Sequence, residues 1–551
     1  MIKSQLKKRV DTCFQLGIRE GFWSEAAAER YTVEVPKHEE QGDFSTNLAM
    51  VVAGMDKKNP REVASRLVDM LASDKDFIDR LEIAGPGFVN FFLKDEVWRT
   101  VLDPVLENEA QFGLADIGAG KRVMVEFVSA NPTGPLSIGH GRNAILGDSI
   151  ARLLEAVGYD VTREYYFNDA GRQMRVLGAS TRARYLELLG KESEFPEDGY
   201  QGDYIYDIAR AMIAESGESL KDADVMVFKD YAKAAIFRDI DNTLKKIGIT
   251  FDTYYNEHSL YEEGLVDEVV RDLRSKDLVY EKEGATWFKT TVLGQEQDRV
   301  IIKSSGEPTY RLPDIAYHRE KFRRGYEWMI DIFGADHIAT VPDVLAGVRA
   351  LGLDETKIDV ILHQFVTLLR DGKQVKMSTR KATFITVDEL LDEVGPDVLR
   401  FFFLMRKADS QLEFDLDLAT RQSQENPVYY VQYAHARLCS IERQAAEKNI
   451  APKPPGKASL EYLVEPEEYR LLKTVAGYPA LVAGAAQDLA PHRIIFYLMD
   501  LAGQFHSYYN KHKVLSDDEN MTAARYCLCR AIKIVFRNGL NLVGLRAPES
   551  M

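Results

Sequence analysis

The spacing of apolar positions changes along the chain and divides it into three regions. In residues 1–110, the opening segment MIKSQLKKRVDTCF has helical spacing, a second helix follows Pro60, and IAGPGFVNFFL comes later. The Gly-Pro-Gly in that last segment predicts a turn between two strands, the second running from Phe88 to Leu93. We therefore expect a compact α+β domain at the N-terminus.

The pattern in residues 115–410 is that of an α/β sheet domain. RVMVEFV is a continuous apolar run, as expected for a buried parallel strand, and the turn-rich segment SANPTGPLS follows it. The spacing of Ile145, Ile150 and Leu153 predicts a helix in the next segment, and VTREYYF predicts another strand. Strand, glycine-containing loop, helix and strand form the opening unit of a doubly wound nucleotide-binding sheet.

A charge-rich and mainly helical segment near residues 181–290 interrupts this alternation, which resumes near WFKTTVLG and continues through KIDVILHQFVTLL. An insertion in the sheet domain is the simplest explanation. In residues 414–551 four segments with helical periodicity predict an α-helical bundle, with APKPPGKAS as a linker between helices. The expected fold class is α/β: a Rossmann-type parallel-sheet catalytic domain with an insertion, between an α+β domain and a helical bundle.

Composition narrows the class of protein. The hydrophobic fraction of 45% and the charged fraction of 28% are those of a soluble globular protein, and no apolar run is long enough for a membrane span. The N-terminus lacks the apolar core of a signal peptide, so a cytoplasmic protein is expected. Only four scattered cysteines are present, which predicts ordinary thiols and neither a zinc site nor another bound metal.

The net charge is −16, from 70 basic and 86 acidic residues. This balance argues against indiscriminate binding of polyanions, which usually requires an overall basic protein. It does not exclude an RNA of defined shape that meets local basic patches.

The segment EFVSANPTGPLSIGHGRNAILGD lies where a ligand is expected, in the first strand-to-helix loop. A helix N-terminus offers free N–H groups and a favourable dipole to phosphate. Gly139 and Gly141 would let a ligand approach the backbone, and His140 adds a neutral or cationic donor. The alternative is an ordinary glycine-containing turn onto a helix.

A second segment, RDGKQVKMSTRKATFITVDELLDEVG, places a basic and hydroxyl-containing loop before a helix. Such a loop can close over a triphosphate and supply positive charge as pyrophosphate leaves. The alternative is a solvated basic loop. Its polar side chains are Lys373, Lys376, Ser378, Thr379, Arg380 and Lys381.

Together these segments resemble the paired signatures of class I aminoacyl-tRNA synthetases. Ser137–His140 occupies the HIGH position and Lys376–Arg380 the KMSKS position, about 240 residues later. Further sequence segments along the whole chain resemble the arginyl-tRNA synthetase family: GDFSTNLAM, SANPTGPL, REYYFNDAGRQM, TYRLPDIAYHREKF, NPVYYVQYAHARLCSI and GLNLVGLRAPESM.

The resemblance implies an arginine–tRNA ligase that uses ATP, accompanied by Mg²⁺, to form arginyl-adenylate and then transfers arginine to the terminal ribose of tRNA(Arg). The implied arginine-binding residues are Glu126, Ser129, Asn131, Tyr310 and Asp314. The implied ATP-binding residues are Ser137, Gly139, His140, Gly141, Asp336, His337, Lys376, Met377 and Ser378, with catalytic roles for His140, Lys376 and Arg380.

Elementary chemistry agrees with the pair Tyr310 and Asp314, because a planar guanidinium is best bound by a carboxylate beside a hydroxyl or aromatic ring. A surface ion pair and a core tyrosine are the alternative. The family further implies that tRNA binds before adenylate forms. It also implies that the N-terminal domain contacts the tRNA elbow and that the helical bundle contacts the anticodon. The protein is expected to be a monomer. Residues with either a core or a base-stacking role are Tyr429, Tyr430, Tyr433, Arg437, Tyr508 and Tyr509.

The chain departs from the family pattern at two positions. Ser137 replaces the first histidine of HIGH, and Thr379 replaces the second lysine of KMSK. Gly134 stands where some relatives carry a substitute lysine, which leaves Arg380 or Lys381 to compensate. Two rival interpretations are another class I synthetase, opposed by the arginine-pocket residues and the lack of zinc-ligand clusters, and a tRNA-binding protein that has lost catalysis.

Overall fold

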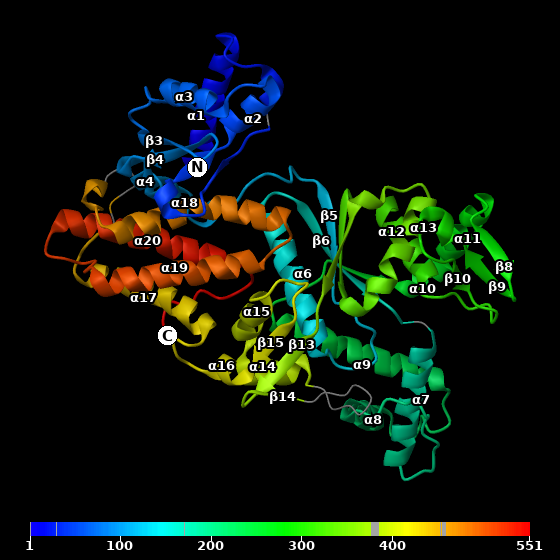
Figure 1. Ribbon diagram of the computed structural model, residues 1–551. Coiled ribbons are helices and arrows are strands. Elements are labelled where there is room, and N and C mark those ends of the chain that lie inside the picture. The colour runs from blue at the N-terminus through cyan, green and yellow to red at the C-terminus, as the bar shows by residue number, and fades with distance from the viewer. Residues whose placement is uncertain (1, 29, 170, 376–384, 452, 454–458) are drawn as a thin grey trace.

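The computed structural model describes residues 2–551 except 29, 170, 376–384, 452 and 454–458. The predicted linker APKPPGKAS therefore lies largely outside the described residues. The chain forms an N-terminal α+β part, a central parallel sheet with helices, and a long helical bundle (Figure 1). This arrangement confirms the expected fold class.

The central sheet has five strands in the order β12-β11-β5-β6-β7, and all neighbouring strands are parallel. Their bounds are β5 Arg122–Glu126, β6 Asp160–Phe167, β7 Thr253–Asn256, β11 Trp328–Gly334 and β12 Ile358–His363. The apolar run of β5 is buried because the strand is central, and Val123, Met124 and Val125 are fully covered. All five strands therefore present their carboxyl ends at one edge.

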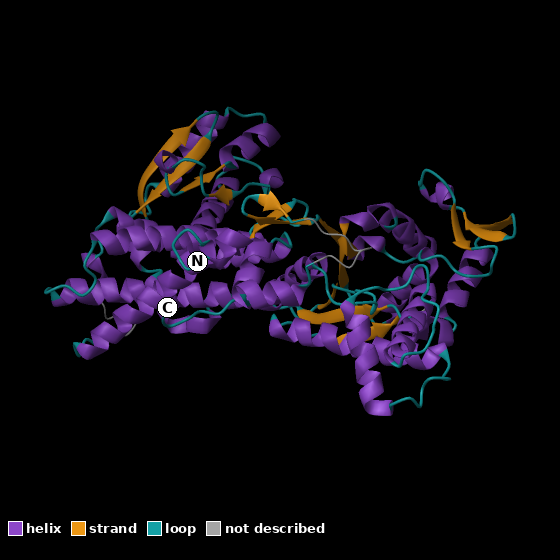
Figure 2. Ribbon diagram, turned by 90° about the horizontal axis from the view of Figure 1, so that it is seen from below, coloured by secondary structure: helices purple, strands orange, loops and turns teal. Residues whose placement is uncertain are grey.

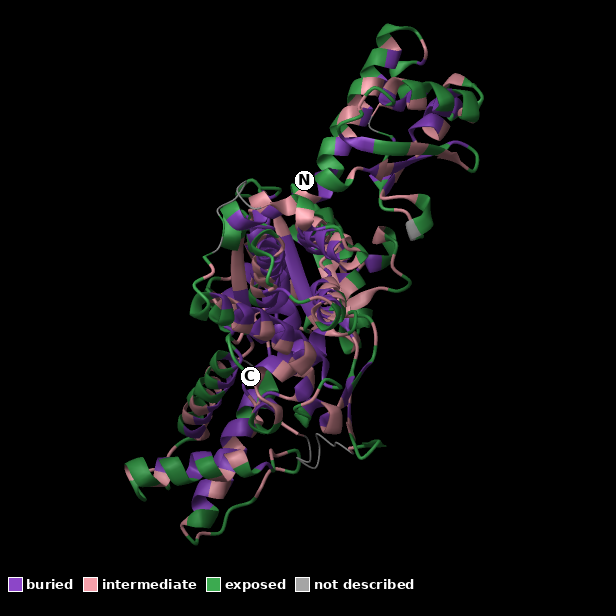
Figure 3. Ribbon diagram, turned by 90° about the vertical axis from the view of Figure 1, so that its left-hand side faces the viewer, coloured by how far each residue is buried: buried purple, intermediate pink, exposed green. Residues whose placement is uncertain are grey.

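Helix α6 (Ile138–Ala156) follows β5, as the hydrophobic spacing predicts, and Ile145, Ile150 and Leu153 are completely buried. Helices α12 (Arg311–Arg323) and α13 (Val341–Ala350) flank β11 in sequence. Buried positions concentrate in the sheet and in the helices that surround it (Figure 3).

The segment predicted as an insertion contains a strand of the main sheet. Helices α7 (Gly171–Leu188), α8 (Asp203–Ser216) and α9 (Val225–Lys246) lie between β6 and β7. The prediction that the parallel alternation resumes at WFKTTVLG is wrong, because β9 belongs to a separate antiparallel sheet. The chain between β7 and α12 forms this separate sheet and two helices. Its elements are α10 Glu257–Glu262, α11 Leu265–Ser275, β8 Val279–Lys282, β9 Ala285–Phe288 and β10 Arg299–Ile302.

The N-terminal part contains the predicted opening helix, the helix at Pro60 and the two strands around the Gly-Pro-Gly turn. Asn59 caps α3 by accepting from the Arg61 N–H, and Pro60 occupies the first helical position. Elements here are α1 Ile2–Arg19, α2 Leu48–Asp56, α3 Pro60–Leu71, α4 Asp95–Arg99, α5 Leu102–Asn108, β1 Val33–Glu34, β2 Phe44–Thr46, β3 Ile78–Ala84 and β4 Phe88–Leu93.

The helical bundle follows a small sheet and three short helices. Those elements are β13 Val366–Arg370, β14 Lys373–Gln374, α14 Val387–Val394, α15 Pro396–Leu404, β15 Leu412–Asp415 and α16 Leu416–Thr420. The four predicted helices are α17 Pro427–Glu447, α18 Pro466–Gln487, α19 His492–Lys511 and α20 Glu519–Leu542. The N-terminal part lies on this bundle (Figures 1 and 2), with Arg99 Nε donating to the Leu463 carbonyl at 3.1 Å.

Arg400 of α15 joins three parts of the molecule. Its guanidinium is 1% exposed and donates to the carbonyl of Ile247 at 2.8 Å, the carbonyl of Val543 at 3.2 Å and Oδ2 of Asp148 at 2.6 Å. These partners follow α9, follow α20 and lie on α6, respectively. Arg400 therefore connects the end of the helical bundle to the helix that begins after β5.

The four cysteines are unpaired: Cys439, Cys527 and Cys529 are buried and Cys13 is half-buried. In the part of the chain that the structure describes, every helix is too short or too polar to cross a membrane.

Candidate active site

The chain leaves β5 through a strained loop. Val128 and Ser129 have φ angles of 66° and 42°, in a region that branched side chains rarely adopt. The Val128 N–H donates to Oδ1 of buried Asn143 at 2.7 Å, and the Asn143 amide donates to the Ile332 carbonyl at 2.8 Å. Because such a conformation costs about 1–3 kcal/mol per residue, these bonds from α6 are needed to hold the loop.

Glu126, the last residue of β5, has a buried carboxylate. Its Oε2 accepts from Nζ of Lys321 at 2.6 Å, and its Oε1 accepts from the Ser129 hydroxyl at 3.1 Å. The Ser129 hydroxyl also accepts from the Tyr166 N–H at 3.1 Å. Burial raises the pKa of Glu126, and the Lys321 ammonium opposes that rise. Glu126 and Ser129 are thus held together at the carboxyl edge of the sheet.

Asp314 lies one turn into α12 and approaches the same region. Its carboxylate has neither a hydrogen bond nor an ion pair with any residue that the structure describes. Burial raises the pKa of Asp314 to about 7; His318 and Lys321 lower it, while Glu257 and Glu126 add to the rise. An unpaired carboxylate in such a place is suited to a cationic ligand.

The side chains of Tyr310 and Asn131 are more exposed to solvent than that of Glu126. Tyr310 precedes α12 and is 68% exposed, which excludes the core-tyrosine alternative. The Asn131 amide donates to Oε1 of Gln173 on α7 at 2.8 Å. The structure therefore places Glu126, Ser129 and Asp314 close together, whereas the side chain of Tyr310 is exposed to solvent.

Arginine binding should weaken as the pH falls, because a guanidinium requires the ionised form of Asp314. A carboxyl group that gains a cation has a lower pKa, so binding releases a proton wherever the free group is protonated. With a free pKa of about 7, affinity at about pH 6 should be roughly tenfold below its value at about pH 8.5. Titration calorimetry in buffers of different ionisation enthalpy measures the affinity and the released protons; constant affinity across this range would contradict the assignment.

The start of α6 presents a histidine in one defined tautomer. Nδ1 of His140 accepts from the Ser137 backbone N–H at 3.2 Å, which leaves the ring proton on Nε2. Burial lowers the pKa of His140, against a smaller opposing effect of Asp336, so the ring is neutral near pH 7. A neutral N–H donor at a helix N-terminus is suited to a phosphate oxygen.

Ser137 occupies the N-cap position of α6, with extended backbone angles. Serine is a favoured residue at this position, whereas the histidine of the family signature is not. We expect Ser137→His to lower thermal stability by the equivalent of about 0.5–2 kcal/mol, because the serine hydroxyl that lies 3.2 Å from Nδ1 of His140 is lost at the N-cap. Adenylate formation should be retained or faster, because the backbone N–H of residue 137 still donates to His140. Thermal unfolding and single-turnover adenylate formation test this; a large loss of rate would show that the site requires serine.

Gly139 and Gly141 have different surroundings. A Cβ on Gly139 would meet only Ser137 Oγ at 3.8 Å, so the backbone is open to a ligand. A Cβ on Gly141 would lie 2.9 Å from Cγ2 of Val387 and 3.3 Å from Phe403. The missing side chain of Gly141 allows α14 and α15 to pack on α6, and a contact between Gly141 and ATP stays a prediction.

The residues that follow the basic loop pair through their backbone with the segment that begins α6. Val387, the first residue of α14, donates its N–H to the Leu136 carbonyl at 2.9 Å, and Thr386 pairs with Ser137 as an isolated antiparallel bridge. The segment after the basic loop is thus bound to the segment that begins α6. Outside the described residues lie Lys376, Met377, Ser378, Thr379, Arg380 and Lys381.

Asp336 and His337 lie at the carboxyl end of β11, in a 3-10 turn (Ala335–Ala339). Both are exposed, and the His337 ring stacks on Phe333 with centroids 5.2 Å apart. His363, at the end of β12, is buried, and burial lowers its pKa to about 4. The sheet edge beside α6 therefore carries a second neutral imidazole.

Three residues that the structure places at this edge, Arg142, Asn143 and Lys321, were not predicted from the sequence. Arg142 is 1% exposed and donates to the backbone carbonyls of Gln364, Lys407 and Ser410 at 2.7, 2.8 and 2.9 Å. The available signal was two consecutive polar residues directly after the glycine-histidine motif and before the apolar run Ala144–Leu146. Lys321 gave no comparable signal within a charged segment.

The aromatic residues of the bundle divide into two groups. Tyr508 is completely buried and donates to Glu468, so it belongs to the core. Arg437 lies over the rings of Tyr433 and Tyr509, 4.6 and 4.7 Å from their centroids, and Tyr433 stacks on Tyr429. These partly exposed rings form a continuous aromatic and cationic surface.

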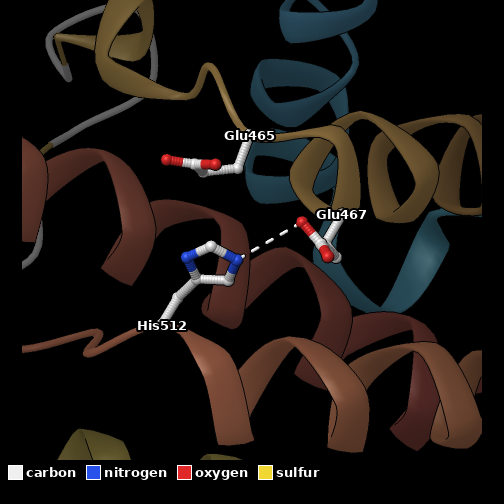
Figure 4. Close-up of side chains that lie close together, drawn as sticks. All are labelled: Glu465, Glu467 and His512. Carbon is white, nitrogen blue, oxygen red and sulfur yellow. Dashed lines mark hydrogen bonds and ion pairs between the residues drawn. The ribbon is translucent and has the colours of Figure 1, made fainter.

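One group in the described part of the chain has the spacing of cation ligands: Glu465, Glu467 and His512 (Figure 4), with ligand atoms within 4.8 Å of one another. Lys511 Nζ lies 2.5 Å from Glu467, and His512 Nε2 lies 3.3 Å from it. Lys511 and the N-terminus of α18 already supply positive charge there. The group is an ion-pair network between α18 and α19.

Comparison with known proteins agrees with this geometry. Three family models match: "Arginyl tRNA synthetase N terminal domain" over residues 1–93, "tRNA synthetases class I (R), catalytic domain" over residues 101–400, and "DALR anticodon binding domain" over residues 431–551.

Relatives match over their full length. An arginine–tRNA ligase of Desulfotalea psychrophila is 65% identical and the alignment covers 100% of both chains; one of Citrifermentans bemidjiense is 48% identical over 99% of this chain and 100% of its own. The solved structure of the Thermus thermophilus arginyl-tRNA synthetase shares the fold, with a TM-score of 0.76, 23% identity and complete coverage of both chains. Since the catalytic family model alone spans more than half of the 551 residues, and full-length relatives agree, the chain belongs to the arginyl-tRNA synthetase family of class I synthetases.

Proposed function

We propose that this chain, an arginine–tRNA ligase, carries out its chemistry at the carboxyl edge of β5 and the start of α6. The observation that supports this site best is the bond between Val387 and Leu136, because it ties the start of α14, which follows the basic loop in sequence, to the segment that begins α6. Arginine is held there by Glu126, Ser129, Asn131, Tyr310 and Asp314.

In the first step an arginine carboxylate oxygen attacks the α-phosphorus of ATP. The new P–O bond forms as the bond to the pyrophosphate oxygen breaks, so no protein nucleophile is required. The Nε2–H of His140 and the α6 N-terminus stabilise charge on the phosphates, with Lys376 and Arg380 in the same role. ATP enters as its magnesium complex. The other proposed ATP contacts are Ser137, Gly139, Asp336, His337, Met377 and Ser378.

In the second step a terminal ribose hydroxyl of tRNA(Arg) attacks the acyl carbon of arginyl-adenylate, and AMP leaves. We assign residues 1–110 to contact with the tRNA elbow, residues 115–410 to catalysis and residues 414–551 to the anticodon. The surface of Tyr429, Tyr433, Arg437 and Tyr509 is suited to stacking unpaired bases. We further propose a cytoplasmic monomer; the unpaired cysteines fit a reducing compartment.

The test is arginine-dependent exchange between ATP and pyrophosphate, measured with and without tRNA(Arg). We expect exchange only when arginine and tRNA are both present, and none with lysine in place of arginine. A protein that binds tRNA(Arg) but gives no exchange would be the binding protein without catalysis that Ser137 and Thr379 suggest as the alternative.

A further inference from the structure

Four buried side chains form a continuous row of charges behind the arginine pocket. Nζ of Lys321 lies 2.6 Å from both Glu126 Oε2 and Asp331 Oδ1, and Nε2 of His318 lies 2.8 Å from Asp331 Oδ2. None of the four is more than 5% exposed. We call Glu126, Lys321, Asp331 and His318 the buried charge row.

The row ends at the backbone of Asp314. Nδ1 of His318 donates to the Asp314 carbonyl at 2.7 Å, and its Nε2 faces the carboxylate of Asp331, so both ring nitrogens have partners. Despite burial, Lys321 and His318 hold the pKa of Asp331 well below its ordinary range. Lys321 therefore lies between the two carboxylates of the row, and the Asp314 carboxylate beyond it has no partner among the described residues.

We propose that Lys321 is the positioning residue of the arginine pocket. Its ammonium holds the carboxylate of Glu126 at the end of β5 and, through Asp331 and His318, fixes the turn of α12 that carries Asp314. This role rests on the proposed function of that pocket. A guanidinium forms two directional bonds in one plane, so the carboxylates that receive it must keep a fixed separation.

A stabilising role alone does not explain the buried ammonium. Removing an ammonium from water is costly even when it is paired, and well-packed apolar residues often replace buried ion pairs without loss of stability. Lys321 is completely buried, and its Nζ also lies 4.5 Å from the centroid of the Tyr317 ring. A function at the pocket accounts for the retention of this charge.

The charge of Lys321 also has an electrostatic effect on the pocket. The titratable groups whose charges act on Asp314 or respond to it are Glu126, Tyr166, Glu257, Tyr261, His318 and Lys321. Lys321 and His318 lower the pKa of Asp314 and so favour its carboxylate form, whereas Glu257 and Glu126 raise that pKa. Loss of the Lys321 ammonium should therefore move the acid limb of arginine binding to higher pH.

The experiment compares Lys321→Met with Arg319→Met, a matched control on the same helix. Arg319 is also a buried cation between two carboxylates, Asp272 and Glu268, but it contacts α11 and not the pocket. For Lys321→Met we expect an arginine Michaelis constant raised on the order of tenfold, an unchanged constant for ATP, and an acid limb shifted upward by about half a pH unit or more. Arg319→Met should lower thermal stability and leave both arginine parameters unchanged.

Should Lys321→Met fail to fold, the double variant Lys321→Met/Asp331→Asn removes one charge of each sign and should show the same shift. An unmoved acid limb and unchanged arginine constant in either folded variant would overturn the role of Lys321. A wild-type protein without any acid limb would instead contradict the pocket assignment itself, so the two failures are distinguishable.

Discussion

Asp314→Asn should raise the Michaelis constant for arginine by roughly 30- to 900-fold, because it removes one charge-assisted contact with a desolvated guanidinium, worth about 2–4 kcal/mol. Binding of ATP should change little, since Asp314 lies on α12 and the phosphate donors lie at the start of α6. The change also removes the group that titrates near pH 7, so the acid limb of arginine binding should disappear with it.

Steady-state pyrophosphate exchange with arginine and ATP varied separately measures both effects. Asp272→Asn is a suitable control because this carboxylate pairs with Arg319 on the far side of α12. It should leave the arginine constant within about twofold, because the pair joins α12 to α11 and does not reach the pocket. If Asp314→Asn left that constant and the turnover unchanged, Asp314 would not bind the guanidinium.

Arg400→Met should destabilise the folded protein by about 3–5 kcal/mol, the cost of breaking a buried ion pair by removing one partner. The change leaves Asp148 with Arg152 at 2.8 Å and deprives the carbonyls of Ile247 and Val543 of their donor. Because these groups belong to different parts of the molecule, the loss should also make their unfolding less cooperative.

Thermal unfolding followed by calorimetry and by tryptophan fluorescence tests this prediction. Arg421→Met is the control, since Arg421 forms an exposed pair with Glu425 in the loop between α16 and α17, and its loss should cost below about 1 kcal/mol. Equal midpoints for the two variants would mean that Arg400 does not hold the junction together.

The long periodic elements were predictable from sequence, and the short ones were not. The apolar run of β5 and the helical spacing of α6 each reflect burial of a whole element, so the pattern persists over many residues. β7 has only four residues, TYYN, and three of them are half-buried, which leaves no periodic signal. Strand β9 has an equally short pattern, which explains why its segment was assigned to the main sheet and not to the hairpin that it forms with β8.

In the site, residue types were predictable and their contacts were not. Family signatures identify Glu126 and Asp314, but nothing near Lys321 in the sequence indicates a contact with Glu126, which lies 195 residues away. Gly141 shows the same limit, because a glycine signals the absence of a side chain and not the identity of its neighbour. That neighbour, Val387, reaches Gly141 only through tertiary packing.

The hydrogen bond from Val128 to Asn143 makes these two positions depend on each other during evolution. Glycine at position 128 would adopt the observed φ of 66° without strain, so the loop would rely less on Asn143. Loss of Asn143 while valine remains would leave the strain unopposed. Substitutions at contacting sites are not additive, so their order matters. A lineage that acquires glycine first can later lose the asparagine, whereas the reverse path passes through an impaired enzyme.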